Sequence, residues 1–530
     1  MPQHTAAPPR PEKETDLNGA DSLVATLVES GVEVCFANPG TSEMHFVSAL
    51  DRIPGIRPVL CLFEGVATGA ADGYARMTGK PACTLLHLGP GFANGMANLH
   101  NARKGQSPVI NVVGDHATYH ERYNAPLTSN VTAFAEAISH WVARPRSARA
   151  VAADAARAVR AARTAPGQVA TLILPADTAW LQAERPAPAL PVPVPAPVAQ
   201  DAIDVAAKAL MDGGKTAILL RGSVLHGEGL AAAGRICAKT GATLFCDTFT
   251  PRMRSGAGSP VVERLPYRGK DVLARLDGFD RLLLVGAQPP VSFFAYPGQE
   301  GWLTPPHCDI LTLSQPDEDG NRALADLATA IDAPDHAPTV PLDPPALPAD
   351  GPLTAEAAMR IVAALLPENA IVADEGITST LPYANQLSQA APHDYLALTG
   401  GSIGGILPLS TGAAVAAPDR KVVCLEGDGS AMYTLQALWT QAREDLNVVT
   451  VLYANRSYAV LNQELKLVRA ASKGDKALSL LDLHDPALDW VKLAEGMGVQ
   501  AVRAETTQAF ADALRSALDA SGPRLIEAVI

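Results

Sequence analysis

Glu426-Gly427-Asp428-Gly429-Ser430 directly follows an apolar run, residues 421–425, of the kind that forms a parallel strand covered on both faces. The glycines on either side of Asp428 let the backbone turn sharply and approach a ligand closely. After this turn the sequence predicts a helix over residues 430–443, whose N-terminal amides are placed to hold a phosphate, and a second buried strand over residues 447–453. This order of elements predicts a parallel α/β sheet with a ligand at its strand ends.

Asn455 follows the second strand and lies 27 positions after Asp428, about the length of one strand-helix-strand crossover. A carboxylate and an amide oxygen at neighbouring strand ends make an oxygen-only site, which suits Mg²⁺ bound to a diphosphate. An isolated Gly-Asp-Gly is more often an ordinary turn. The flanking strand and helix, together with Asn455, favour the binding site over that alternative.

Glu64 occupies a comparable place in the N-terminal part of the chain. Residues 59–63 are predicted to form a buried strand, and residues 65–76 a helix of mainly small side chains. Ligands of open parallel sheets bind at the carboxyl ends of strands, so a glutamate at this point is a candidate functional carboxylate. Taken alone, Glu64 is equally well explained as an acid that stabilises the start of a helix.

Length, charge and cysteine content limit the class of protein and the kinds of partner. A chain of 530 residues predicts about three domains, and a formal net charge of −13 argues against nucleic acid or a membrane surface as a partner. No apolar stretch is long enough to span a membrane, and residues 1–15 are polar and proline-rich, which predicts a disordered tail and no secretory signal. The seven cysteines form no Cys-x-x-Cys pair, so we expect reduced core thiols and a cytoplasmic location.

Two proline-rich stretches, residues 184–200 and 332–350, are predicted to be extended linkers. They divide the chain into an N-terminal domain over residues 16–184, a central domain over residues 200–332 and a C-terminal domain over residues 351–530. Strands alternate with alanine-rich helices in each of them. The predicted fold is therefore α/β, with three doubly wound parallel-sheet domains.

The Asp428 motif resembles the diphosphate-binding motif of thiamine-diphosphate enzymes. That motif usually ends in Asn-Asn and here ends in Ala454-Asn455, which keeps the asparagine whose side chain binds the metal. The resemblance implies Mg²⁺ ligation by Asp428, Asn455 and the backbone carbonyl of Ser457. In this half of the chain it implies cofactor contacts by Thr378, Gly427, Gly429, Ser430 and Tyr458.

Other segments, spread over residues 18–530, resemble the acetolactate synthase large-subunit and benzoylformate decarboxylase branch of this family, in particular acetolactate-synthase-like proteins of mycobacteria and related bacteria. The matching segments are the Asn38-Pro39-Gly40 turn, residues 62–64 around the catalytic glutamate, residues 86–95 as a glycine-rich active-site loop, and residues 399–404, which bend the cofactor. The resemblance implies that Glu64 hydrogen-bonds the aminopyrimidine ring and so activates the cofactor. It also implies that a backbone carbonyl near Gly401 meets the pyrimidine amino group and that Ile403 supports the bent cofactor.

Residues 286–298 depart from the flavin-containing members of that branch. They lack the acids and the arginine of the family's Asp-Asp-Arg-Val-type segment, so we expect no FAD. Phe293 and Phe294 stand where benzoylformate decarboxylases carry an acid-base histidine, and with Ile403 they are expected to form an apolar wall. His87 matches the other active-site histidine of those enzymes, although a strand-end histidine bonded to backbone is an alternative.

Two more histidines, His116 and His120, follow a predicted strand on a loop that is either solvated or enters the pocket, and the solvated loop is favoured. Glu64 and His87 are therefore the candidate catalytic residues.

The resemblance implies a transferase or lyase that uses thiamine diphosphate and Mg²⁺ to decarboxylate a small 2-oxo acid and ligate the product to a second carbonyl compound. Two alternatives stay open: a benzoylformate-type decarboxylase that releases an aldehyde, and a weakly active cofactor-binding partner of a true synthase. Members of the family complete each site with residues from two subunits, so we expect a homodimer or a dimer of dimers.

Overall fold

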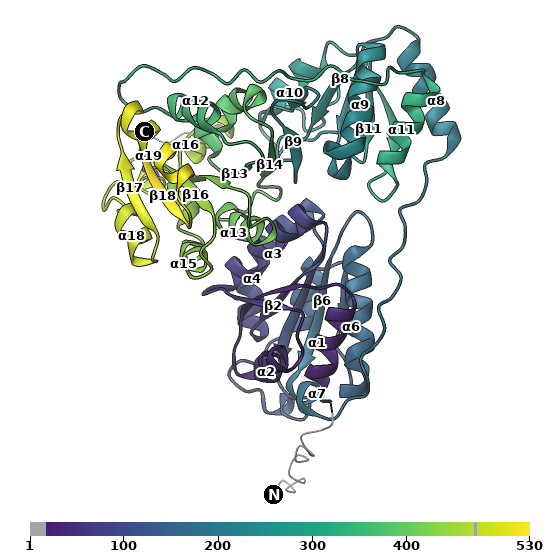
Figure 1. Ribbon diagram of the computed structural model, residues 1–530, viewed down its shortest axis with the longest axis vertical. Helices are drawn as coiled ribbons and strands as arrows, with labels where there is room; N and C mark the ends of the chain where they lie inside the picture. Colours follow the sequence, from purple (N-terminus) through teal and green to yellow (C-terminus); the bar gives the residue numbers. More distant parts are fainter. Residues whose placement is uncertain (1–16, 471–473) are drawn as a thin grey trace, which may run out of the picture. The chain divides into compact units, whose positions relative to one another are not determined.

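The computed structural model describes residues 17–470 and 474–530, so the predicted N-terminal tail lies outside the described residues. The chain divides into two compact units (Figure 1). The first unit extends to residue 193 except for residues 76–78 and 104–106, which belong with residues 194–530 in the second. One sheet lies in the first unit and two lie in the second, and all three are parallel apart from one edge strand. The predicted α/β fold with three parallel sheets is confirmed.

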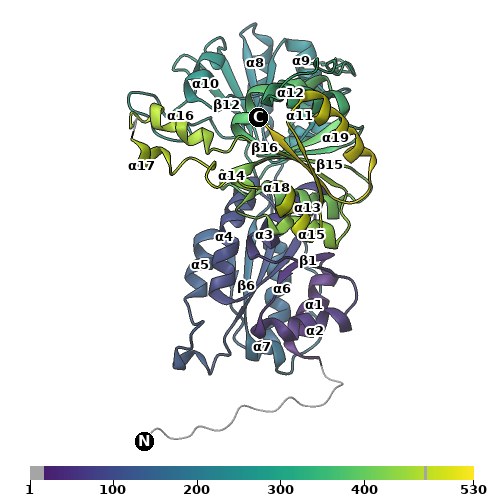
Figure 2. The ribbon, with the colours of Figure 1, turned by 90° about the vertical axis from the view of Figure 1, so that its left-hand side faces the viewer.

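Six parallel strands form the sheet of the first unit. In spatial order they are β2 (Arg57–Leu60), β1 (Val34–Asn38), β3 (Ala82–Leu86), β4 (Val109–Asp115), β6 (Val169–Pro175) and β5 (Trp141–Ala143). Helices α1 (Gly19–Glu29), α2 (Met44–Arg52) and α6 (Ala148–Arg163) cover one face, and α4 (Leu88–Gly105) and α5 (Val131–Ile138) lie on the other (Figure 2). Two further helices are α3 (Glu64–Thr78), packed on α4, and α7 (Ala176–Trp180), which follows β6.

The strand before Glu64 differs from its prediction. β2 ends at Leu60, and it is the edge strand of the sheet, with Arg57 and Pro58 exposed. The prediction of a buried strand over residues 59–63 was wrong, because the chain leaves the sheet after Leu60 and begins α3 at Glu64. Glu64 therefore follows the strand by a short link and is the first residue of a helix.

Five parallel strands form the central sheet, in the second unit. In spatial order they are β10 (Val262–Arg264), β8 (Thr243–Cys246), β7 (Thr216–Leu220), β11 (Arg281–Val285) and β12 (Asp309–Ser314). Helices α8 (Gln200–Met211), α9 (Gly227–Thr240) and α11 (Gly320–Ala330) bury apolar side chains such as Ile236 and Leu324 in one core cluster. Helix α10 (Gly269–Leu276) buries Leu276 in a second cluster.

Seven strands form the C-terminal sheet, also in the second unit. In spatial order they are β17 (Gln500–Ala504), β18 (Arg524–Val529), β16 (Val448–Ala454), β15 (Val422–Gly427), β13 (Ile371–Asp374), β14 (His393–Ala397) and β9 (Met253–Ser255). Helices α12 (Ala355–Leu365) and α19 (Thr507–Asp519) share a core with one face, and α13 (Ile406–Ala416) and α15 (Gln436–Arg443) pack below the strands in Figure 1. The remaining helices are α14 (Asp428–Ala431), α16 (Ala459–Leu467), α17 (Asp475–Leu478) and α18 (Trp490–Gly496).

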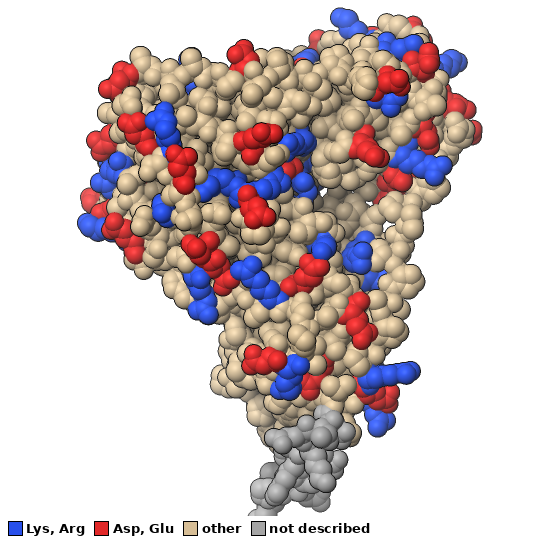
Figure 3. Space-filling model, in the orientation of Figure 1, with Lys and Arg blue, Asp and Glu red and all other residues tan. Residues whose placement is uncertain are grey.

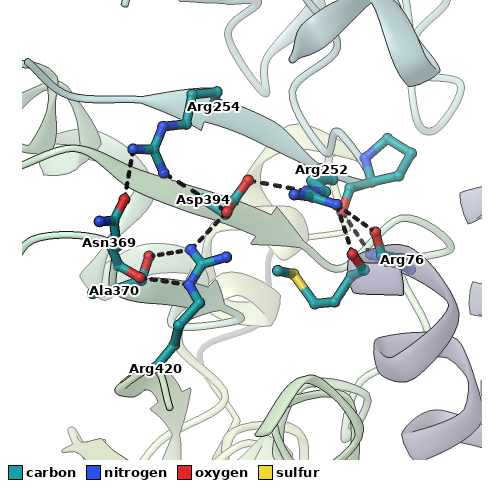
Figure 4. Close-up of polar contacts among 9 residues, drawn as sticks. Arg76, Arg252, Arg254, Asn369, Ala370, Asp394 and Arg420 are labelled. Atoms are coloured by element: carbon teal, nitrogen blue, oxygen red, sulfur yellow. Dashed lines mark hydrogen bonds and ion pairs between the residues drawn. The ribbon is translucent and has the colours of Figure 1, made fainter. Parts of the chain in front are cut away.

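β9 comes from the central part of the sequence but pairs antiparallel with β14 of the C-terminal sheet. Buried Asp394 on β14 accepts from Arg252 Nε at 2.9 Å and from Arg420 at 2.6 Å (Figure 4). Burial alone raises the pKa of Asp394, but Arg252 and Arg420 outweigh this effect and hold the pKa below its usual range. Arg252 also donates to the backbone carbonyls of Arg76 and Met77. These contacts join the central residues to the C-terminal sheet within the second unit.

The helix predicted over residues 430–443 is in fact two helices, α14 and α15. The residues between the two helices contact Gly404: the Thr434 hydroxyl donates to the Gly404 carbonyl at 2.8 Å, and Tyr433 packs against Gly404. A single continuous helix was therefore wrong. The turn that carries Asp428 still follows β15 directly.

No helix within residues 17–470 and 474–530 is long and apolar enough to cross a membrane. On the face shown in Figure 3, basic and acidic side chains are interspersed, with no broad surface of positive charge.

Candidate functional site

The carboxylate of Asp428 is fixed against the end of the neighbouring strand. β15 and β16 pair in parallel up to Gly427 and Tyr453, so Asp428 and Asn455 follow adjacent strand ends. Asp428 Oδ2 accepts the N–H of Arg456 at 2.7 Å, and Oδ1 accepts the N–H of Gly429 at 2.8 Å. Burial raises the pKa of Asp428, and the backbone donors of Arg456 and Gly429 oppose that rise. The structure therefore brings Asp428 and the Asn455 turn together, as the sequence predicted.

Oxygen atoms dominate the donor set at this edge. Asn455 Oδ1 accepts the N–H of Ser457 at 3.0 Å, and the Ser457 hydroxyl donates to Leu481. A carboxylate has about four acceptor positions and an amide oxygen two, so Asp428 and Asn455 can bind a metal in addition to the backbone N–H groups that they accept. Among the described residues there is no group of three or more His, Cys, Asp and Glu side chains that could hold a metal. A carboxylate, an amide and a backbone carbonyl nevertheless form a donor set that fits Mg²⁺, which takes few protein ligands and keeps water or phosphate oxygens.

Small residues bring other side chains close to this donor set. A Cβ on Gly429 would lie 2.5 Å from the ring of Tyr458, so glycine is required for the close approach of these two residues. Gly427 and Ser430 flank Asp428 at the start of α14. Thr378, half-buried, lies on the short 3-10 helix that follows β13. The predicted diphosphate contacts therefore come from the carboxyl ends of β13, β15 and β16, which are neighbours in the sheet.

The segment between β14 and α13 carries the two residues expected to shape the cofactor. Gly401 is exposed and has a φ of 74°, a conformation that favours glycine, and Ile403 is half-buried. Buried Glu375, at the end of β13, accepts three backbone N–H groups from this segment. Sequence reasoning missed Glu375, although Asp374-Glu375-Gly376 ends an apolar run as Glu426-Gly427-Asp428 does and offered the same signal.

Glu64 is buried in the first unit and is held by a helix that was predicted to be a loop. Its Oε2 accepts the amide of Asn94 at 3.0 Å. The predicted glycine-rich loop over residues 86–95 was wrong, since α4 begins at Leu88. The glycines serve helix packing: a Cβ on Gly91 would lie 2.7 Å from Glu64 Oε1, and a Cβ on Gly95 would lie 2.9 Å from Thr68. Tertiary packing overrides the low helix propensity of glycine here.

His87 is bonded to a side chain, and this excludes the alternative of a histidine bonded only to backbone. Its Nδ1 lies 2.8 Å from Oε2 of Glu43, whose side chain is fully buried. The same oxygen accepts the N–H of Gly40 at 2.7 Å, and a Cβ on Gly40 would overlap the His87 ring. Asn38 ends β1, and Pro39 and Gly40 lead directly to this contact. Glu43 was missed from the sequence, where only the Asn38-Pro39-Gly40 turn was singled out.

Several expected residues lie apart from these clusters or at the surface. His120 is exposed and His116 is half-buried, and their rings are tilted against each other with centroids 5.6 Å apart in the loop after β4. Phe293 and Phe294 are 44% and 57% exposed. The ring of Phe293 packs edge-on against Phe249 with centroids 5.2 Å apart, so Phe293 extends a partly buried aromatic cluster, and both phenylalanines leave apolar surface accessible.

Comparison with known proteins identifies relatives over the whole chain. Residues 17–139 match the N-terminal TPP binding domain of thiamine pyrophosphate enzymes, and residues 376–528 match their C-terminal TPP binding domain. The chain is 52% identical over 517 residues to "Putative acetolactate synthase large subunit IlvX" of Mycobacterium tuberculosis, with 97% of this chain and 99% of that protein covered. It is 28% identical over 532 residues to benzoylformate decarboxylase of Pseudomonas aeruginosa, with 94% and 96% covered. A solved structure of a thiamine diphosphate-dependent 4-hydroxybenzoylformate decarboxylase from Rhodococcus jostii RHA1 matches with a TM-score of 0.85 and 26% identity, covering 97% of this chain and 99% of that one.

Proposed function

Since the chain belongs to the thiamine pyrophosphate enzymes, we propose that it uses thiamine diphosphate, the same cofactor, with Mg²⁺ to decarboxylate a small 2-oxo acid and ligate the product to a second carbonyl compound. The observation that carries this proposal is the Asp428 carboxylate bonded to the backbone beside Asn455 at adjacent strand ends. The name of the 52%-identical relative supports acetolactate-synthase-like chemistry over other reactions of the family.

The chain's own residues have distinct roles in this proposal. When bound, the cofactor supplies an electron sink for the loss of CO₂. Asp428, Asn455 and the Ser457 carbonyl hold Mg²⁺ against the diphosphate. Glu64, kept in place by Asn94, offers its carboxylate to the aminopyrimidine ring. His87, oriented by Glu43, donates and accepts protons at the substrate oxygen.

The absence of FAD is supported by the ion pairs and hydrogen bonds that two arginines of the central region make within the protein. Arg221 and Arg252 are the charges in the central region that suit a flavin diphosphate. Arg221 pairs with Asp247 and donates to the Lys104 carbonyl. Arg252 pairs with Asp394 and donates to backbone carbonyls (Figure 4). Each guanidinium is therefore already neutralised by a protein carboxylate, which weakens its attraction for a flavin diphosphate. Freshly purified protein should therefore be colourless, and yellow protein with stoichiometric FAD would contradict this assignment.

A homodimer, or a dimer of such dimers, is supported by exposed apolar residues next to the candidate catalytic groups. Leu62 lies two positions before Glu64 and Met44 directly follows Glu43, and each is 44% exposed. Each of these side chains therefore leaves apolar surface accessible in the first unit. A second copy that brings its Asp428 half to this edge would bury them, which is the arrangement that the family resemblance implies.

An arylformate-type decarboxylase that releases an aldehyde is the second candidate. It is favoured by the accessible aromatic surface of Phe293 and Phe294 and by the names of the benzoylformate decarboxylase relatives. A product analysis separates the two functions: purified protein with thiamine diphosphate and Mg²⁺ is incubated with a panel of aliphatic and aromatic 2-oxo acids, and CO₂, aldehyde and hydroxyketone are measured. Hydroxyketone as the main product supports the proposal, whereas stoichiometric aldehyde supports the second candidate. Cofactor binding without any CO₂ release would instead indicate the weakly active partner of a true synthase.

A further inference from the structure

The residues 399–405 form an irregular connection that has to be held in one conformation if Gly401 and Ile403 are to meet a cofactor. β14 ends at Ala397 and α13 begins at Ile406, so no helix or strand fixes the backbone between them. Gly401 and Gly404 both have positive φ values, of 74° and 82°. Four of the seven residues in this stretch are glycines, which allow many backbone conformations, so the conformation observed needs specific contacts.

Glu375 supplies the main contact. Its Oε1 accepts the N–H of Gly404 at 2.6 Å, and its Oε2 accepts the N–H groups of Gly405 at 2.9 Å and Ile406 at 3.0 Å. The carboxylate thus binds three consecutive amides at the N-terminus of an eleven-residue helix, where a negative charge is favoured. The carbonyl of Gly404 is held in turn by the hydroxyl of Thr434 at 2.8 Å. Both sides of Gly404 are therefore fixed.

Glu375 also lies close to the turn that carries Asp428. Burial raises the pKa of Glu375 to about 7, and the three amides and the nearby Ser430 hydroxyl oppose this rise. Ser430 lies on α14, two residues after Asp428. The N–H of Glu375 donates to the Leu425 carbonyl of β15 at 2.8 Å, so this buried residue joins the 399–405 segment to the strand that leads into the turn with the proposed metal ligand.

We propose that Glu375 is a positioning residue for the cofactor: it locks the 399–405 segment to the diphosphate turn, and so places the Gly401 carbonyl and Ile403 for the pyrimidine and thiazolium rings. This inference rests on the proposed function. It assigns a role in activation to a residue that contacts neither ring and that the sequence motifs do not include.

Substitution by glutamine tests the role with little change of shape. A glutamine has one acceptor oxygen and one amino group, so the amino group necessarily faces either the Gly404 amide or those of Gly405 and Ile406. Donor then meets donor, and the segment moves away from β13. Asp374 provides a matched control, since it is buried, precedes Glu375 directly and binds Tyr395 and Thr380 without contacting residues 404–406.

The measurement is the rate of deuterium exchange at the thiazolium carbon of thiamine diphosphate bound with Mg²⁺, together with cofactor affinity and the melting temperature. Misplacement of a reacting group by about 1 Å costs on the order of 100-fold, so we expect Glu375→Gln to slow exchange at least tenfold while Asp374→Asn stays within about threefold of wild type. Gly404→Ala, whose Cβ would overlap Tyr433, should shift the same segment and reproduce the slow exchange if Glu375→Gln does not fold. Wild-type exchange in Glu375→Gln, or equal loss in Asp374→Asn at equal melting temperature, would overturn the role of Glu375. Bound cofactor that does not exchange in the wild type would instead contradict the proposed function.

Discussion

Two substitutions of Glu43 separate its effect on the position of the His87 ring from the effect of its negative charge. In Glu43→Ala the N–H of Gly40 and the ring nitrogen of His87 both lose the oxygen that they share at 2.7 and 2.8 Å. Leaving a part-buried polar group without a partner costs about 1–3 kcal/mol, so the variant should lose roughly 2 kcal/mol or more of stability. The freed imidazole also moves, and a displacement of about 1 Å lowers kcat on the order of 100-fold.

Glu43→Gln provides the matched control, because its amide oxygen can occupy the Oε2 position and keep both bonds. Its amino group then faces the Ser42 hydroxyl, which lies 2.8 Å from Oε1 and is able to accept. We expect this variant to retain the fold and to lose about tenfold or less in kcat, since only the charge assistance of the bond is removed. The assay is steady-state CO₂ release with the best 2-oxo acid of the panel, beside thermal melts. Wild-type kcat in Glu43→Ala would refute the orienting role, and so would equal losses in the two variants.

Three further perturbations test other parts of the account. Glu64→Gln removes the carboxylate expected at the pyrimidine ring but keeps its shape, so CO₂ release should fall at least on the order of 100-fold while calorimetry still detects cofactor binding; normal turnover would exclude Glu64 from activation. Asp428→Ala should weaken Mg²⁺-dependent cofactor binding more than Asn455→Ala does, because Asp428 is the only charged residue among the proposed ligands. The control Asn447→Ala, just before the start of β16, should have no effect. Unchanged affinity in both site variants would place the diphosphate elsewhere. Burial lowers the pKa of His393 to about 4, and its Nδ1 donates to the Ala391 carbonyl. Below the ordinary value of 6.5 the unfolded state binds a proton that the folded state does not, so stability falls as pH is lowered from 6.5 toward 4, by roughly 2 kcal/mol between pH 7 and pH 5. Denaturant midpoints should show this loss in wild type and a smaller one in His393→Asn; an equal pH dependence in both proteins would assign it to other groups.

Elements that are encoded locally could be predicted from the sequence. The buried strands around Asp428 are continuous apolar runs, and the spacing to Asn455 matched one crossover, so the sheet edge that brings Asp428 and the Asn455 turn together could be located before the structure. α3 could be predicted from its run of small residues. Each of these features depends on neighbours in the chain.

Features that depend on distant contacts could not be predicted. The glycines of α4 were interpreted as a loop because glycine is a poor helix former, but they are needed where α4 approaches Glu64 and Thr68. Glu375 binds amides 29 to 31 positions away, and β9 is a strand of three residues that exists only because β14 lies beside it. Local propensity carries no information on such partners.

The central claim is that Glu64 and Asp428 are the two halves of one thiamine-diphosphate site, contributed by two subunits. Mixing inactive Glu64→Gln and Asp428→Ala chains under conditions of subunit exchange tests this claim most directly. Half of the randomly formed dimers are hybrids, and each hybrid carries one intact site of two, so CO₂ release should recover to about a quarter of the wild-type level. No recovery despite hybrid dimers shown by mass spectrometry, or a fully active wild-type monomer, would contradict the claim.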